Sequence, residues 1–236
     1  MRLKNIAWYF VISLLTISIL FSPIKVMAKN IPSKLIYLTF DDGPSETVTN
    51  NILDILKHEN IKATFFVIGY KFEGREDVLK RIKEEGHSIG LHTFTHDYKK
   101  IYANEASFID EMNKSGVELK NIIGFSPKII RFPSGSKDHL NPNLLDKLHS
   151  CGYKIFDWNL CLSDGINYNT PVNKLYTEGT KKCINPNKIF LLAHCSGENK
   201  NTCEALPKII KHYKELGYEF RTITEKTPEY HFKISR

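Results

Sequence analysis

Short apolar, β-branched runs alternate with amphipathic stretches along the sequence from residue 34 onward. Hydrophobic residues spaced for a strand or for a helix distinguish the two kinds of segment. Strands are expected at residues 35–40, 63–68, 88–91, 129–132, 153–158, 189–194 and 218–222, and helices at 47–59, 78–85, 103–123, 141–150, 171–182 and 202–216. This alternation has no long polar linker, so it predicts one α/β domain built on a parallel sheet.

Two adjacent carboxylates follow the first expected strand. Asp41 and Asp42 lie in the run Thr-Phe-Asp-Asp-Gly-Pro. Polar residues at the carboxyl ends of strands form the site in folds of this kind. Because neighbouring side chains of a strand point in opposite directions, one carboxylate can bind a metal while the other reaches a bound water. Asp-Gly-Pro is also ordinary turn chemistry, so the pair indicates a site only with partners elsewhere.

Two histidines follow the third expected strand. His92 and His96 are four residues apart, which places both on one side of a helical turn. Imidazole and carboxylate ligands suit zinc and similar divalent metals. With Asp42 they predict a site with open coordination positions, the pattern of a catalytic metal. The alternative is a pair of surface histidines.

Charged side chains also end two later strands. Arg131 ends the fourth, where a guanidinium can pair with a carboxylate and keep it ionised. His194 ends the sixth, where a histidine can act as a general acid. The alternatives are a generic salt bridge for Arg131 and a core histidine for His194.

The net charge of +7 is compatible with an anionic partner such as a wall polymer, a membrane surface or nucleic acid, and the alternative is that it only keeps the protein soluble. The lysines are spread along the chain without a stripe of arginine and aromatic residues, so we expect no nucleic-acid binding. Five cysteines contain no Cys-x-x-Cys spacing and predict no zinc ribbon: Cys151, Cys161, Cys183, Cys195 and Cys203. Their odd number leaves at least one unpaired in a monomer.

Residues 1–28 have the pattern of a targeting segment. Arg2 and Lys4 precede an apolar run over residues 6–21, and small residues follow at 26–28. The run is shorter than the roughly 20 residues of a membrane-spanning helix. We expect cleavage after residue 28, with an uncleaved membrane anchor as the alternative. Both place residues 29–236, the single catalytic domain, outside the cytoplasm.

Together these segments resemble the polysaccharide deacetylase family (carbohydrate esterase family 4), whose members share the NodB homology domain. The resemblance covers roughly residues 34–225, and the motifs occur in the family's order: Thr-Phe-Asp-Asp-Gly, His-x-x-x-His, Arg-x-Pro, a Trp/Asp segment and Leu-x-x-His. It implies a distorted (β/α) barrel with about seven parallel strands. It also implies metal-dependent removal of acetyl groups from amino sugars, with zinc as the usual metal and cobalt or another divalent ion as alternatives.

The resemblance assigns roles to the matching positions. Asp41 would be the general base, oriented by Arg131, and His194 the general acid. The metal ligands would be Asp42, His92 and His96. The backbone N–H of Ser134 would stabilise the oxyanion, and Trp158 would contact the substrate.

Two positions depart from the family's pattern or leave a choice. The aspartate that supports His194 is either Asp157 or Asp164, and counting on from Trp158 favours Asp164. Gly165 then stands where many members carry tryptophan, which predicts a more open wall around the acetyl methyl or one supplied elsewhere.

Cys195 follows His194 where many members have aspartate. It is expected either in a disulfide with Cys203 or Cys161, or as a packed thiol; a thiol close to a metal could also act as an unwanted ligand.

The run Arg-Phe-Pro-Ser-Gly-Ser at residues 131–136 resembles a variant found in exported deacetylases of Gram-positive bacteria. With the targeting segment, it implies a secreted or anchored enzyme acting on N-acetylglucosamine in peptidoglycan. We also expect the enzyme to be a monomer. Chitooligosaccharides and muramic-acid residues stay open as substrates. A further alternative is a protein of this fold that binds wall glycan without turnover, although the complete set of site residues argues against it.

Overall fold

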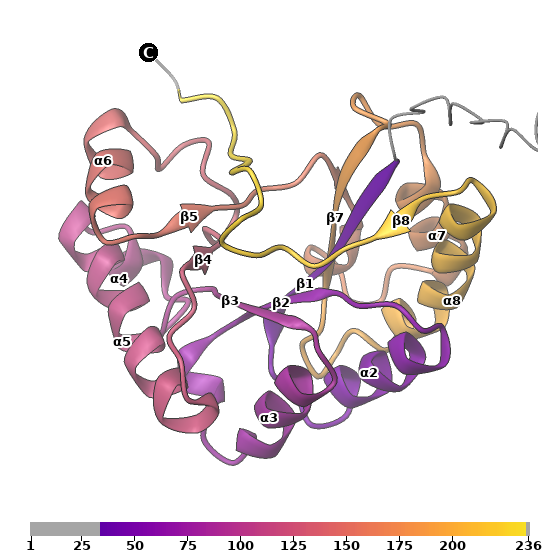
Figure 1. Ribbon diagram of the computed structural model, residues 1–236, viewed down its shortest axis with the longest axis horizontal. Helices are drawn as coiled ribbons and strands as arrows, with labels where there is room; N and C mark the ends of the chain where they lie inside the picture. The colour runs from indigo at the N-terminus through magenta and orange to yellow at the C-terminus, as the bar shows by residue number, and fades with distance from the viewer. Residues whose placement is uncertain (1–33, 235–236) are drawn as a thin grey trace, which may run out of the picture. The chain divides into compact units, whose positions relative to one another are not determined.

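The structure is a computed structural model that describes residues 34–234 (Figure 1). The targeting segment expected at residues 1–28 lies outside this range. Within it, every helix is too short or too polar to cross a membrane.

A curled parallel sheet forms the centre of the domain. Seven strands lie in the order β5-β4-β3-β2-β1-β7-β6, and the eighth, β8, pairs with the start of β1. Their bounds are β1 Leu35–Gly43, β2 Thr64–Val67, β3 Ser88–Leu91, β4 Ile129–Ile130, β5 Lys154–Ile155, β6 Leu160–Cys161, β7 Lys188–His194 and β8 Glu219–Phe220. The predicted α/β barrel of about seven parallel strands is confirmed.

Helices lie to the left of, below and to the right of the strands in the view of Figure 1. They are α2 Val48–His58, α3 Glu76–Glu84, α4 Tyr98–Ile101, α5 Glu105–Ile123, α6 Pro142–Ser150, α7 Val172–Thr180 and α8 Lys200–Glu215, with 3-10 turns η1 Gly69–Lys71 and η2 Ser163–Gly165. All six expected helices are present. Short elements such as α4, β6 and η2 have too few residues to show a hydrophobic period, and the sequence did not predict them.

Local side chains fix where two of the helices begin. Asn104 and Asn141 accept the N–H groups of Ser107 and Leu144 through their side-chain oxygens, at 3.0 and 2.9 Å. Such caps satisfy backbone donors that have no partner within the helix. They explain why α5 begins at Glu105, two residues after the predicted start, and why α6 begins at Pro142, directly after its predicted cap.

The central strand β1 is buried because it lies between β2 and β7. Ile36, Leu38 and Phe40 are at most 1% exposed, and each contributes about 1.5–3 kcal/mol by leaving water. The register with β7 pairs Asp41 with His194. Packing of this strand therefore places two of the predicted site residues side by side.

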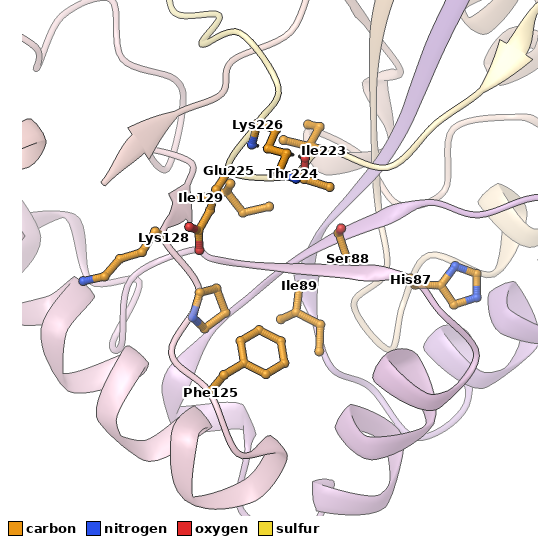
Figure 2. A pocket seen from close by; sticks show the side chains of 11 residues that line it. His87, Ser88, Ile89, Phe125, Lys128, Ile129, Ile223, Thr224, Glu225 and Lys226 are labelled. Atoms are coloured by element: carbon orange, nitrogen blue, oxygen red, sulfur yellow. Dashed lines mark hydrogen bonds between the residues drawn. The ribbon is translucent and has the colours of Figure 1, made fainter. Parts of the chain in front are cut away.

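A cavity of about 470 Å³ lies at the amino ends of β3 and β4, the edge of the sheet opposite to the predicted site (Figure 2). Figure 2 shows Phe125 and Ile89 close together, with His87 apart from them. The Nδ1 atom of His87 accepts the N–H of Ala63 at 3.1 Å, and burial lowers the pKa of His87 to about 4. This histidine is therefore neutral and structural, and none of the strand-end motifs contributes to the cavity.

Candidate active site and metal centre

Asp42, His92 and His96 converge at the carboxyl ends of β1 and β3. Asp42 Oδ1 lies 3.5 Å from His92 Nε2 and 3.4 Å from His96 Nε2. All three ligand atoms lie within 4.8 Å of one another. The same Asp42 oxygen is buried and has no hydrogen-bond partner among residues 34–234. A buried carboxylate oxygen aimed at two imidazole nitrogens fits a divalent ion, and three protein ligands leave room for water or substrate.

The convergence depends on a strained backbone rather than on a helical turn. Residues 92–96 are not helical, so the predicted helical turn was wrong. Asp42, Thr93 and His96 instead have positive φ angles of 67°, 65° and 52°. For residues other than glycine this conformation costs of order 1–3 kcal/mol each, and such strain gathers at functional sites. These turns place the ring centroids of His92 and His96 5.1 Å apart.

Hydrogen bonds hold this loop and select the ligand atoms. His92 Nδ1 donates to the carbonyl of Arg131 at 2.9 Å, which leaves Nε2 free to bind a metal. Glu111, on α5, accepts the N–H groups of Phe94 and Thr95 at 2.8 and 2.6 Å. The sequence reasoning missed Glu111, because one more glutamate on a helix gives no signal of its own.

The protonation states suit metal binding. Burial alone raises the pKa of Asp42, but the nearby imidazoles, with His92 first, hold it below its ordinary value. Burial, and then the charge of His92, lower the pKa of His96 to about 4. An ionised carboxylate beside a neutral imidazole is the form in which these groups bind a metal.

Asp41 belongs with Arg131. The guanidinium Nη1 donates to Asp41 Oδ1 at 2.8 Å and to Thr39 Oγ1 at 2.7 Å. Its Nε donates to the carbonyl of Phe156 at 2.7 Å, and the side chain is wholly buried. Asp41 Oδ2 points the other way, 3.7 Å from His92 Nε2. Arg131 therefore fixes one carboxylate oxygen and leaves the other facing the metal ligands.

His194 is held by Asp164. Its Nδ1 lies 2.8 Å from Asp164 Oδ1, and its backbone N–H donates to Oδ2 at 2.9 Å. Thr202 also donates to Oδ2, at 2.7 Å. Burial alone lowers the pKa of His194, but the hydrogen bond and charge of Asp164 raise it to about 9. His194 is therefore protonated at neutral pH and can give up a proton.

Asp157, the other candidate to support His194, bonds to different groups. It is fully buried, and its carboxylate accepts the N–H of Ser136 at 3.0 Å, the hydroxyl of Ser136, and the N–H of Phe232 at 2.7 Å. Its own N–H donates to the carbonyl of Tyr230 at 2.7 Å. Asp157 thus ties the segment after Arg131 to residues 230–232.

Gly165 lies against the ring of His194. A Cβ atom at this position would collide with three atoms of the imidazole. Any side chain would require the ring or the η2 turn to move, so glycine suits the close approach of this backbone to His194. A side chain as large as tryptophan would not fit this arrangement.

The cysteines form no disulfides. All five are free thiols. Cys195 is completely buried, and its Sγ donates to the carbonyl of Asp41 at 3.3 Å. Burial raises the pKa of this thiol, which disfavours the thiolate that binds metals. Of the alternatives for Cys195, the structure shows the packed thiol.

One cavity of about 360 Å³ joins these groups. The predicted residues that line it are Asp41, Asp42, His92, His96, Ser134, Trp158 and His194. Arg131 and Asp164 bond to Asp41 and His194 and do not line the cavity. Tyr98 and Ile166 also line it and were not predicted; Ile166 is 92% exposed. The sequence offered one signal for Tyr98, an aromatic residue two positions after a predicted ligand.

Comparison with known proteins identifies the family. The model of the polysaccharide deacetylase family matches residues 28–156. The chain belongs to the polysaccharide deacetylase family. Its members are hydrolases that act on carbon-nitrogen bonds other than peptide bonds. The matched residues include both carboxylates of β1, both histidines after β3 and Arg131, whereas Asp164 and His194 follow them.

Individual relatives extend the likeness beyond the matched residues. A peptidoglycan-N-acetylglucosamine deacetylase of Bacillus cereus is 36% identical over 210 residues, covering 86% of this chain and 72% of the relative. A peptidoglycan-N-acetylmuramic acid deacetylase of Bacillus subtilis is 31% identical over 198 residues, covering 83% of this chain and 72% of the relative. The crystal structure of a polysaccharide deacetylase from Bacillus cereus is 36% identical with a TM-score of 0.72, covering 85% of this chain and 96% of that one.

Proposed function

We propose that this protein removes acetyl groups from N-acetylglucosamine residues of peptidoglycan. The observation that carries the proposal is the convergence of three groups on one cavity: metal donors, the Asp41–Arg131 pair and the His194–Asp164 pair. Hydrolysis of an unreactive amide needs a metal ion to polarise the carbonyl, a base to take a proton from water and an acid to protonate the departing nitrogen. The names of similar proteins support peptidoglycan as the polymer.

The site residues would divide the reaction among them. Asp42, His92 and His96 would hold a divalent ion, for which we propose zinc. When bound, the ion would supply Lewis acidity toward the acetamide oxygen and would lower the pKa of water. Asp41 Oδ2 accepts the proton of the attacking water, because Oδ1 is engaged by Arg131. The carbon–nitrogen bond then breaks, and His194 gives its proton to the departing nitrogen, because an amine anion is a poor leaving group.

Ser134 would stabilise the negative charge on the acetamide oxygen. It lines the cavity with a φ of 63°, and its N–H has no acceptor within residues 34–234. Donors placed where charge develops in the transition state contribute strongly to catalysis. Trp158 forms a wall of the same cavity and would contact the sugar.

We further propose that the enzyme works as a monomer outside the cytoplasm, secreted or anchored to the outer face of the membrane. The wall polymer is located there, and residues 1–28 have the pattern of a targeting segment.

Acetate release tests the function directly. The purified protein is incubated with peptidoglycan and with chitooligosaccharides, with and without added zinc or cobalt. We expect release that stops with a chelator, returns with the metal and is fastest on peptidoglycan. If the metal-loaded protein releases no acetate from any N-acetylated glycan, the function is instead that of a glycan-binding protein.

The pH profile of Asp164→Asn tests the role of His194. A general acid must be protonated, so the rate is present below its pKa and is lost as pH rises through about 9. Without the Asp164 carboxylate the pKa of His194 falls, and we expect the alkaline limb of kcat/KM, which reports the free enzyme, to move to lower pH. At pH 8 the rate should fall about 10- to 100-fold.

Asp157→Asn is the matched control, because its carboxylate bonds to Ser136 and Phe232 and not to His194. Its alkaline limb should stay near that of the wild type. Equal shifts in the two variants, or no shift in Asp164→Asn, would contradict the assignment.

A further inference from the structure

A second cavity, of about 410 Å³, adjoins the catalytic one. Trp158 and Cys161 line both cavities. The other lining residues of the second cavity are Asn159, Leu160, Lys181, Ile184, Asn185, Tyr230 and Phe232. All of them follow the stretch that matches the family model. Its volume lies in the range of small-molecule sites.

The aromatic walls of this second cavity are held in place. The rings of Trp158 and Phe232 meet edge to face, 5.3 Å apart at 78°. Both rings pack against Gly135, where a Cβ would lie only 2.7 Å from Phe232 and 3.0 Å from Trp158. Tyr230 stacks on Phe190 at 4.8 Å. Fixed and partly exposed aromatic rings present apolar faces on which the C–H groups of a sugar ring can pack.

The second cavity carries a single positive charge. Lys181 is the only Lys, Arg, Asp or Glu among its lining residues. The neighbouring carboxylate of Glu178 is engaged by Lys174 at 3.8 Å and by the N–H of Ser163 at 2.8 Å. Within residues 34–234, no carboxylate lies within ion-pair distance of Lys181. An exposed ammonium group without a partner is available to an anionic ligand.

The charge of Lys181 also acts on the wall shared by the two cavities. Burial raises the pKa of the Cys161 thiol, and the charge of Lys181 opposes that rise. The ammonium group therefore influences a residue that also faces the catalytic cavity. A ligand that fills both cavities would carry its reacting group in one and its negative charge in the other.

We propose that this second cavity is a subsite for the sugar next to the one that reacts, and that Lys181 recognises a carboxylate carried by that sugar. The inference rests on the proposed deacetylase function and narrows the substrate to an acidic glycan. In peptidoglycan, N-acetylglucosamine alternates with a sugar that bears a lactyl ether. The carboxylate is on that ether in peptide-free strands and on the attached peptide in peptide-bearing strands.

The test compares three substrates of similar length: peptide-free strands, peptide-bearing strands and neutral chitooligosaccharides. Lys181→Ala should raise KM for the acidic strands about two- to five-fold, as expected for an exposed ion pair. Lys181→Glu should raise it about ten-fold, because two negative charges then face each other. We expect a much smaller change in KM for the neutral oligomer. At about 0.5 M salt, the difference in KM between the wild type and the Lys181 variants on acidic strands should decrease, because salt screens exposed charges.

Comparing the two acidic substrates shows which carboxylate Lys181 recognises. A Lys181 effect confined to peptide-free strands assigns the lactyl group, and one confined to peptide-bearing strands assigns the peptide. Lys182→Glu is the matched control, because this neighbouring exposed lysine does not line the cavity. Similar effects of the Lys181 and Lys182 variants, or equal effects on acidic and neutral substrates, would overturn the proposal.

A binding measurement separates this inference from the proposed function. The affinity of the same three glycans is measured by calorimetry in the Asp41→Asn background, with and without Lys181→Glu. Loss of affinity for acidic strands supports the subsite even if the wild type releases no acetate, a result that would refute only the deacetylase activity. Unchanged affinity for acidic strands refutes the subsite whatever the activity.

Discussion

Replacing Asp41 by asparagine is expected to lower kcat for acetate release about 10³-fold, the size of effect typical for loss of a general base. Asparagine can still accept the hydrogen bond from Arg131 at one oxygen. At the position of Oδ2 it presents an amide that cannot take a proton from water. Metal content, measured by mass spectrometry, should stay that of the wild type, since Asp41 is not among the grouped ligands.

Thr39→Val is the control for this variant. It removes the other side-chain oxygen bonded to Arg131 Nη1 but keeps the Asp41 carboxylate. We expect a far smaller loss of kcat, with thermal unfolding measured for both variants. Wild-type kcat in Asp41→Asn, or equal damage by Thr39→Val, would show that Asp41 is not the base.

Replacing His92 by alanine is expected to empty the metal site and abolish activity. Removing even a residue that orients a ligand costs 10- to 100-fold in metal affinity, so losing the ligand itself should cost at least about 100-fold. Metal content after dialysis and a zinc titration measure the effect directly, without relying on turnover.

His87→Asn provides a matched comparison, because both histidines are buried and flank the same strand, β3, at opposite ends. Asparagine can still accept the N–H of Ala63, and the metal content of this variant should be unchanged. Full metal occupancy in His92→Ala would refute its role as a ligand.

Much of the fold was predictable because long buried strands show a clear pattern. Strand β1 has a mostly apolar run that ends at two carboxylates, and its burial follows from its place between β2 and β7. In contrast, β6 has only two residues and depends on pairing with β7. Such pairing is decided by tertiary contacts, which a single sequence does not display.

The site residues also differ in how far the sequence alone could predict them. His92 and His96 were predictable as metal donors because they occur as a compact motif, and Asp42 because it ends a buried strand, although the turn that joins the two histidines depends on positive φ angles that a spacing rule cannot reveal. The contact between Asp164 and His194 spans 30 positions of sequence and required the folded structure. Gly165 could be understood only once the ring of His194 was seen against its backbone.

The bonds between Asp157 and residues 230–232 bear on how this protein can be shortened or fused. Strand β8 ends at Phe220, so a boundary drawn after the last strand would look safe. Such a cut would remove the N–H that Phe232 donates to Asp157 and the ring that packs on Trp158. Trimmed versions should therefore keep the chain through at least Phe232, and a fusion partner attached after that residue should be joined by a flexible linker.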